Sequence, residues 1–351
     1  MWLFLSLACA SCFELPPSDD DNTEEIPPPP DDDDTAEDSG ETSEGPPELC
    51  GVTEQTDDTD RATDYDRIID LPLETYACGN FDASGDSEWF SFTTTEAGWV
   101  KFDVQAAARG SSADPMYQLF MLEGGDESTR TLGRELSSDP WNVWLAPVPG
   151  TYNVVMGESS NDFGDDYRWW VVASVTKSPV DYGTTEEAVA SAQGRSSVDH
   201  DSFDERLSLT VRPADAEESD YPKTRVLAHL AEIDEVDWWY IPIPEGATSL
   251  HIETDAWQYG SAADNQMDIY WDDDGVFGSS DDEHIWTDNY GHGDHDHDPY
   301  AEICTNLSEH TGITVAVELD PAEQVTGGGM FHWYTIEAYA EYGESEEEAC
   351  K

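Results

Sequence analysis

The sequence predicts an all-β protein: two tandem antiparallel, jelly-roll-like β-sandwiches that follow a disordered acidic N-terminal stalk. Apolar and polar residues alternate along 85–104, where Phe90 and Phe92 precede a glycine turn and Phe102 and Val104 follow it. This period of two is that of a hairpin with one buried face. The pattern returns in the second half of the chain, and no long helical pattern interrupts the short strands.

The repeat is visible in residue spacing. Trp238 follows Trp89 by 149 residues, and Gly260 follows Gly110 by 150 residues. The second hairpin, within 234–254, again alternates apolar with polar residues. Two copies of one module therefore occupy most of the chain.

Each remaining strand of the first module lies between turns rich in Gly, Pro and Asp, which is typical of a β-sandwich. Turns are expected at 110–115, 124–126 and 161–166, and strands at 116–122, 141–145, 151–156 and 167–173. In the second module, strands are expected at 267–270, 312–317 and 331–338.

These patterns divide the chain into five parts. We expect a signal segment at 1–12, a disordered acidic linker at 13–48, the first sandwich at 49–176, a joining linker at 177–213 and the second sandwich at 214–351, with an Asp/His-rich insertion at 271–299. Within the joining linker, 184–194 has the Thr and Gly ends of a short capped helix, and 206–211 is a candidate strand.

The charge of the chain excludes some partners. With 14 Lys and Arg against 79 Asp and Glu, the formal net charge is −65. Such a chain is repelled by nucleic acid and by anionic lipid surfaces. It suits either cationic partners or simple solubility, and a solvated acidic surface is the plainer interpretation.

The six cysteines predict an oxidising compartment. None of the four outside the N-terminal segment forms a CxxC pair or has a zinc-finger spacing, so disulfides are favoured over metal ligation. By position we expect Cys50 to pair with Cys78 and Cys304 with Cys350, each bond contributing roughly 3–4 kcal/mol on the chain-entropy model. Four cysteines allow three connectivities, so this pairing is a hypothesis.

The N-terminal apolar run is too short to span a bilayer and is typical of a secretory signal. Ala10 and Ser11 before Cys12 are similar to a bacterial lipobox, in which that cysteine is lipidated. We therefore expect a lipoprotein of the bacterial outer membrane or cell surface that touches the membrane only through its anchor. A plain secreted protein is the alternative. Proline and acidic residues in 13–48 would keep this stalk extended.

The ordered motifs resemble the bacterial pre-peptidase C-terminal (PPC) domain, which includes the collagen-binding domains of collagenases. The resemblance rests on the acidic and aromatic residues of 86–92 and 234–239, on the Gly-Ser-x-x-Asp-Pro turn of 110–115, and on the Pro-Gly-Thr-Tyr-Asn-Val-Val run of 149–155. It implies a secreted, non-catalytic binding or accessory module, commonly attached to a protease. The chain shows no protease domain to accompany it.

The resemblance also implies calcium, which takes six to eight oxygen ligands. The family's acidic positions correspond in the first module to Glu54, Asp57, Asp58, Asp60, Asp86 and Glu88, and in the second to Asp215, Glu217, Glu218, Asp220, Asp234 and Asp237. With so many acidic residues, chance clusters are the competing interpretation.

Two further metal sites are hypotheses from the insertion. Asp272 and Asp274 begin an acidic loop similar to an EF-hand, although Tyr270 stands where the first ligand belongs. His295 and His297, on alternate residues, would share one face of a strand and suit a transition metal. A loop without defined metal affinity is the alternative for both.

Catalysis has no support from motifs, because G-x-S-x-G, H-E-x-x-H and P-loop patterns are missing. We expect a non-catalytic surface or secreted protein with two PPC-like binding modules, stabilised by calcium, and an unknown macromolecular or glycan ligand. The alternatives are a carbohydrate- or matrix-binding accessory protein of a separate hydrolase and a surface metal-sequestering protein. Trp141, Trp144 and Trp257 are candidates for a sugar-stacking surface, with core packing as the competing interpretation.

Overall fold

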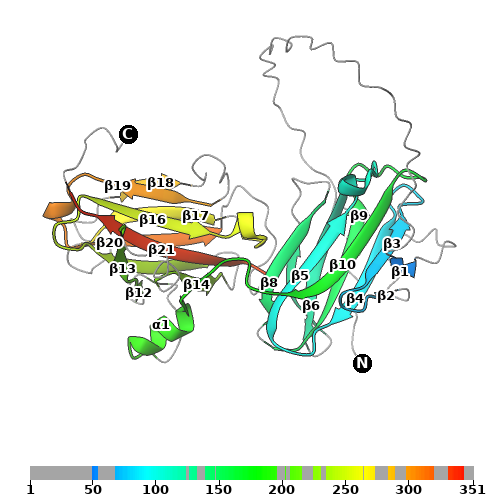
Figure 1. The fold of residues 1–351 in the computed structure, drawn as a ribbon, viewed down its shortest axis with the longest axis horizontal. Helices are drawn as coiled ribbons and strands as arrows, with labels where there is room; N and C mark the ends of the chain where they lie inside the picture. Colours follow the sequence, from blue (N-terminus) through cyan, green and yellow to red (C-terminus); the bar gives the residue numbers. More distant parts are fainter. Residues whose placement is uncertain are drawn as a thin grey trace, which may run out of the picture. The chain divides into compact units, whose positions relative to one another are not determined.

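A computed structural model shows the fold (Figure 1). It describes residues 50–53, 68–123, 126–132, 139–146, 148–195, 202, 206–215, 224–230, 235–263, 265–272, 284–288, 298–319 and 331–343. The predicted signal segment and acidic stalk therefore lie outside the described residues. Within the described ranges, no helix has the length and apolar character that crossing a membrane requires.

The first sandwich contains two five-stranded sheets. One has the order β1-β3-β10-β5-β8, with β1 (Cys50–Thr53), β3 (Tyr76–Asn80), β10 (Arg168–Thr176), β5 (Gly98–Gln105) and β8 (Trp141–Ala146). The other has the order β2-β4-β9-β6-β7, with β2 (Ile69–Asp70), β4 (Ser87–Thr93), β9 (Thr151–Glu158), β6 (Pro115–Glu123) and β7 (Asp126–Leu132).

The second sandwich repeats this order strand for strand. Its first sheet is β11-β14-β21-β16-β19, with β11 (Thr184–Thr185), β14 (Val226–His229), β21 (Trp333–Glu341), β16 (Ser249–Asp255), β19 (Tyr300–Ile303) and an added β13 (Val211–Pro213) on β21. Its second sheet is β12-β15-β20-β17-β18, with β12 (Leu207–Ser208), β15 (Val236–Pro242), β20 (Gly312–Leu319), β17 (Asn265–Trp271) and β18 (His284–Asp288). The predicted fold class, two tandem β-sandwiches, is confirmed.

The segment 177–213, expected to be a linker, instead contributes strands to the second sandwich. β11 pairs in parallel with β14, and β12 pairs in parallel with β15, as β1 and β2 do with β3 and β4. The helix α1 (Glu186–Ala192) lies between β11 and β12, with Thr185 at its N-cap. The second module thus begins near Thr184 rather than at 214.

The predicted hairpins are wrong, because β4 and β5 lie in different sheets, as do β15 and β16, and the chain crosses between the sheets at each glycine turn. The period of two remains, because each of these strands has one face on the core. In β4 the buried residues alternate with half-exposed ones, so Phe90 and Phe92 enter the core, with exposures of 0% and 1%. In β15, Trp239 and Ile241 do the same at 0% exposure.

The structure contains the predicted disulfide between Cys50 and Cys78, which joins β1 to β3 with a Cα–Cα distance of 5.8 Å. Cys304 is also disulfide-bonded. Its predicted partner, Cys350, lies outside the described residues.

The glycine that opens the Gly-Ser-x-x-Asp turn has the same conformation in both modules. It follows a one-turn 3₁₀ helix, η2 (Ala107–Arg109) or η5 (Trp257–Tyr259), and Gly110 and Gly260 adopt left-handed φ values of 77° and 91°. Asp139 accepts backbone N–H bonds from Ala106 and Ala108, and Asp298 accepts them from Ala256, Trp257 and Gln258. One carboxylate therefore orders each turn.

Residues 46–351 form one compact unit, and β8 contacts the turn after η5 within it. The backbone N–H of Val143 donates to the Gly260 carbonyl at 2.8 Å, and Trp333 Nε1 donates to the Val143 carbonyl at 2.6 Å. Asn142 Nδ2 also donates to the Gly260 carbonyl at 3.2 Å. The backbone N–H and C=O of Val143 on the edge strand β8 are therefore hydrogen-bonded, so this part of the sheet edge is not left exposed.

Candidate functional site

Each sandwich carries a pair of aromatic rings on the outer face of its second sheet. In the first sandwich, Trp89 of β4 and Phe120 of β6 have ring centroids 6.3 Å apart and ring planes 12° apart. In the second, Trp238 of β15 and Tyr270 of β17 have centroids 6.1 Å apart and planes 37° apart. We call these the outer aromatic pairs. Trp89, Trp238 and Tyr270 are half-buried, while Phe120 is 8% exposed.

Strand register shows that the two pairs occupy equivalent positions. Trp89 faces Val155 across β4 and β9, and Phe120 faces Asn153 across β6 and β9. In the second sandwich, Ala316 and Thr314 of β20 take the places of Val155 and Asn153 beside Trp238 and Tyr270. A central strand separates the two aromatic residues in each case, which leaves them on neighbouring diagonal positions.

In the second sandwich the row of rings continues onto β18. The His284 ring lies 5.0 Å from the Tyr270 ring, and its Nε2 lies 3.1 Å from Asp268 Oδ1. The His284 side chain is 48% exposed, so it is accessible to a ligand. Trp238, Tyr270 and His284 form a row across the sheet.

A line of polar groups borders this row. Gln266 Nε2 donates to Asp268 Oδ2 and to Glu318 Oε1, both at 3.3 Å. Burial, together with the charges of Asp268 and Glu318, raises the pKa of the Tyr270 hydroxyl, which keeps it protonated as a hydrogen-bond donor. The row thus combines aromatic surface with amide, carboxylate and hydroxyl groups.

The residues that the structure describes assemble no calcium site by themselves. They contain no group of three or more His, Cys, Asp or Glu side chains placed to hold a metal ion. Asp237 is 0% exposed and accepts a 2.6 Å bond from the Tyr334 hydroxyl, which itself accepts from Trp239 Nε1 at 2.8 Å. Asp237 lies two residues before Trp239 in β15, so both side chains point to the same, core-facing side of the strand.

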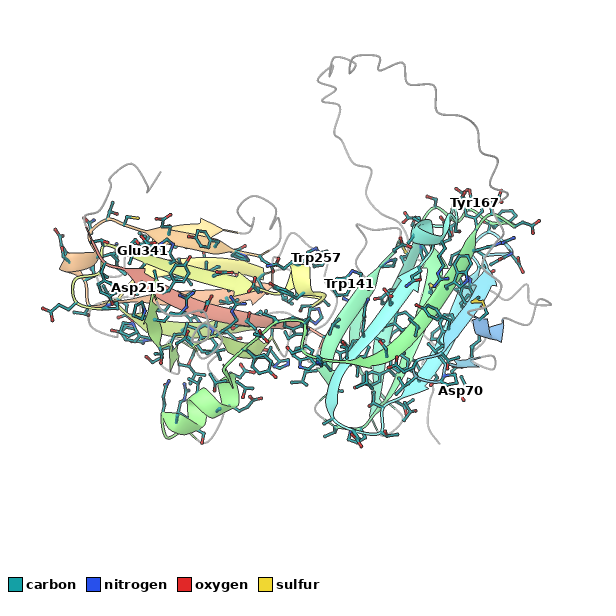
Figure 2. The ribbon with its side chains drawn as sticks, in the orientation of Figure 1. Asp70, Trp141, Tyr167, Asp215, Trp257 and Glu341 are labelled. Atoms are coloured by element: carbon teal, nitrogen blue, oxygen red, sulfur yellow. A yellow bond between two sulfur atoms is a disulfide. The ribbon has the colours of Figure 1, made fainter. Side chains whose placement is uncertain are left out.

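The other described candidates have partners or positions of their own. Asp86 accepts a 2.8 Å hydrogen bond from the backbone N–H of Asp82, and burial raises the pKa of its carboxyl group. Glu88 is 8% exposed and lies on the core-facing side of β4. Asp272 accepts from Thr314 Oγ1 at 2.7 Å and pairs with Arg206 at 3.0 Å. Asp215 is exposed in the turn after β13 (Figure 2). The predicted ligands that lie outside the described residues are Glu54, Asp57, Asp58, Asp60, Glu217, Glu218, Asp220, Asp234 and Asp274.

The predicted His-rich metal site lies outside the described residues, as does Cys12. Of the three tryptophans considered for sugar stacking, Trp144 is fully buried in the first core. Trp141 lies under the Lys101 amine at 5.0 Å and close to Gly260, and Trp257 is half-buried in η5 (Figure 2). Core and turn packing account for Trp144 and Trp141.

A cluster of charged side chains, which we call the charged face, lies on the outer side of β16 and β21, where Arg212, Asp255 and Glu337 are buried. Arg225 lies 2.7 Å from Asp255 and 2.8 Å from Glu337, and 3.8 Å from Glu253. Arg212 pairs with Glu337 at 3.4 Å. Burial, followed by the charge of Asp255, raises the pKa of Glu253 to about 7. Three carboxylates therefore share two guanidinium groups, and Glu253 has the weakest contact.

No protein-family model matches the chain, and no curated protein matches it. Among solved structures, it is similar to the pre-peptidase C-terminal domain of a collagenase from Bacillus anthracis, at 12% identity and a TM-score of 0.25, over 30% of this chain and 94% of that one. It is also similar to the CBM22-1-CBM22-2 tandem domain of Paenibacillus barcinonensis Xyn10C, at 11% identity and a TM-score of 0.21, over 76% of this chain and 86% of that one. At these TM-scores neither likeness carries an argument, and the sheet topology alone establishes the fold.

Proposed function

We propose that this protein is a non-catalytic binding protein outside the cytoplasm, anchored by a lipid on Cys12 and built from two PPC-like modules. The observation that carries the proposal is the outer aromatic pair, which both sandwiches place at the same positions. Trp89, Trp238 and Tyr270 are half-buried on a sheet face, and such aromatic side chains are typical of recognition surfaces, while the buried Phe120 supports Trp89. The Cys50–Cys78 disulfide and the bonded state of Cys304 support an oxidising compartment.

Among the alternatives, the aromatic pairs favour a carbohydrate- or matrix-binding accessory role. Net charge of −65 supports a ligand that is not a nucleic acid. The metal-sequestering alternative depends on the His-rich part of the insertion, which lies outside the described residues.

The lipid anchor is tested by fractionating a Gram-negative host that expresses the full chain. We expect the protein in the membrane fraction and expect Cys12→Ala to move it to the soluble extracytoplasmic fraction. Cys9→Ala is the matched control and is expected to leave it in the membrane fraction. A soluble wild-type protein, or equal release by both variants, would contradict the anchor, and fully reduced cysteines in a cytoplasmic fraction would contradict the proposed location.

Calcium stabilisation stays a prediction, because most of the implied ligands lie outside the described residues. For the metal-stripped full chain, we expect millimolar Ca²⁺ to raise the unfolding midpoint, since a ligand at about 100 times its Kd adds roughly 2.7 kcal/mol. Asp234→Ala should abolish the rise. Asp237→Asn should leave the rise in place, because the Asp237 side chain is buried and bonded to Tyr334. An unchanged midpoint in the wild type would remove calcium from the proposal.

A further inference from the structure

We infer that the two outer aromatic pairs are binding platforms for a neutral polysaccharide, and that the protein engages one polymer through both. This inference rests on the proposed function and names the ligand class of the same surface. The other outward residues are Ser87, Ser91 and Thr93 on β4 and Val236, Tyr240 and Pro242 on β15, and yet a tryptophan recurs at the same place on both strands.

The chemistry of the row in the second sandwich selects the ligand. Aromatic rings present a negative π-face, which favours the slightly positive C–H groups on the flat face of a sugar ring. Tyr270 and His284 continue the surface from Trp238 at centroid separations of 6.1 and 5.0 Å, with ring planes 37° and 53° apart, so consecutive sugar units of one twisted chain meet consecutive rings.

The bordering polar groups suit hydroxyls. Asp268 and Glu318 accept hydrogen bonds, Gln266 both donates and accepts, and the Gln266 amide holds the two carboxylates in place. A sugar hydroxyl is at once donor and acceptor, so it can join such a line without introducing a charge.

The negative charge of the protein favours neutral polymers over anionic ones. The carboxylates of Asp268 and Glu318 border the row, and the whole chain carries −65. Sulfated or uronic polymers would be repelled by this field. A continuous row of rings across the sheet suits a polymer lying over the surface, and two platforms in one chain convert weak single-site affinity into avidity.

The test uses the purified full chain and insoluble cellulose, xylan and chitin as probes, with collagen and heparin beads alongside. We expect pelleting with at least one neutral polysaccharide and none with heparin. Trp89→Ala and Trp238→Ala should each lower the apparent affinity by at least about 100-fold, because avidity from linked sites is on the order of 10²–10⁴. The double variant should not pellet.

Matched controls remove exposed aromatic residues away from these platforms. Phe163→Ala and Tyr342→Ala, at positions 53% and 50% exposed, should retain full binding. Trp238→Phe keeps a ring and should retain most of it. If Trp238→Ala unfolds, His284→Ala replaces it, because that side chain is 48% exposed and its loss should weaken binding without unfolding the sheet.

The outcomes separate the inference from the proposed function. Pelleting with no polysaccharide, or full binding by the Trp89→Ala, Trp238→Ala double variant, overturns the glycan inference. Binding to collagen that is lost in these variants also overturns it, while assigning the same surface to a protein ligand and leaving the proposed function intact. A cytoplasmic, reduced protein in the fractionation experiment overturns the proposed function itself.

Discussion

Replacing Gly260 with alanine is expected to lower the free energy of unfolding by about 3 kcal/mol. Two effects add. Gly260 has φ of 91°, where an L-residue costs roughly 1–2 kcal/mol. A Cβ at this position would also lie 2.1 Å from Cζ3 of the Trp141 ring, and overpacking of this kind costs about 1–3 kcal/mol. Urea unfolding of the full chain measures the loss.

The repeat provides the control for this prediction. Gly110 has φ of 77° at the equivalent turn, but a Cβ there meets no atom within 4 Å. Gly110→Ala should therefore lower the free energy of unfolding by only about 1 kcal/mol, which is the cost of the left-handed backbone conformation without a steric clash. Equal losses in the two variants would show that the Trp141 ring moves aside at little cost.

Replacing Glu253 with glutamine is expected to stabilise the protein at pH 8 by about 1–2 kcal/mol and to change little near pH 4.5. The pKa of Glu253 is raised from 4.5 to about 7 by burial and by Asp255, so the folded state holds this proton more tightly than the unfolded chain. Stability is therefore lost as pH rises from about 4.5 to 7. The Glu253 side chain is 32% exposed, and solvent screening reduces the expected stabilisation to about 1–2 kcal/mol.

The groups facing Glu253 fix the sign of this effect. Asp255 and Glu337 repel its charge, Arg225 and Arg212 attract it, and the Tyr300 and Tyr339 hydroxyls face it from β19 and β21. The difference in unfolding free energy between variant and wild type, followed from pH 4.5 to 8, is the measurement. Glu309→Gln, at an exposed site, should show no such trend. A less stable Glu253→Gln at pH 8 would mean that the Arg225 contact outweighs the repulsion.

The sequence predicted the strands, the repeat and the fold class because a period of two is a local property. It also placed Trp89 on the side opposite Phe90, which the structure confirms. It did not predict which strands pair: β4 and β5 belong to different sheets, as do β15 and β16, so the predicted hairpins are wrong. The short strands β11 and β12 were missed: two residues each cannot show a period, and their parallel pairing depends on contacts distant in sequence.

The candidate site was only partly predictable for the same reason. Tyr270 lies in an expected strand, but its position beside Trp238 follows from β20 passing between their strands. The aromatic composition pointed instead to Trp144, which is core, and the family resemblance pointed to Asp237, which bonds Tyr334 inside the sandwich. Residue type alone did not distinguish an inward carboxylate from a surface one; the alternation in β15 does.

The short parallel strands at the start of each module bear on how the protein can be divided. A fragment starting at Ala214 would lack β11, β12 and β13. It would leave the edges of β14 and β15 without partners, and unpaired edges promote association between chains. A soluble second sandwich therefore has to begin upstream of Thr184, and a proteolytic cut between α1 and β14 would damage this sandwich rather than separate two intact modules.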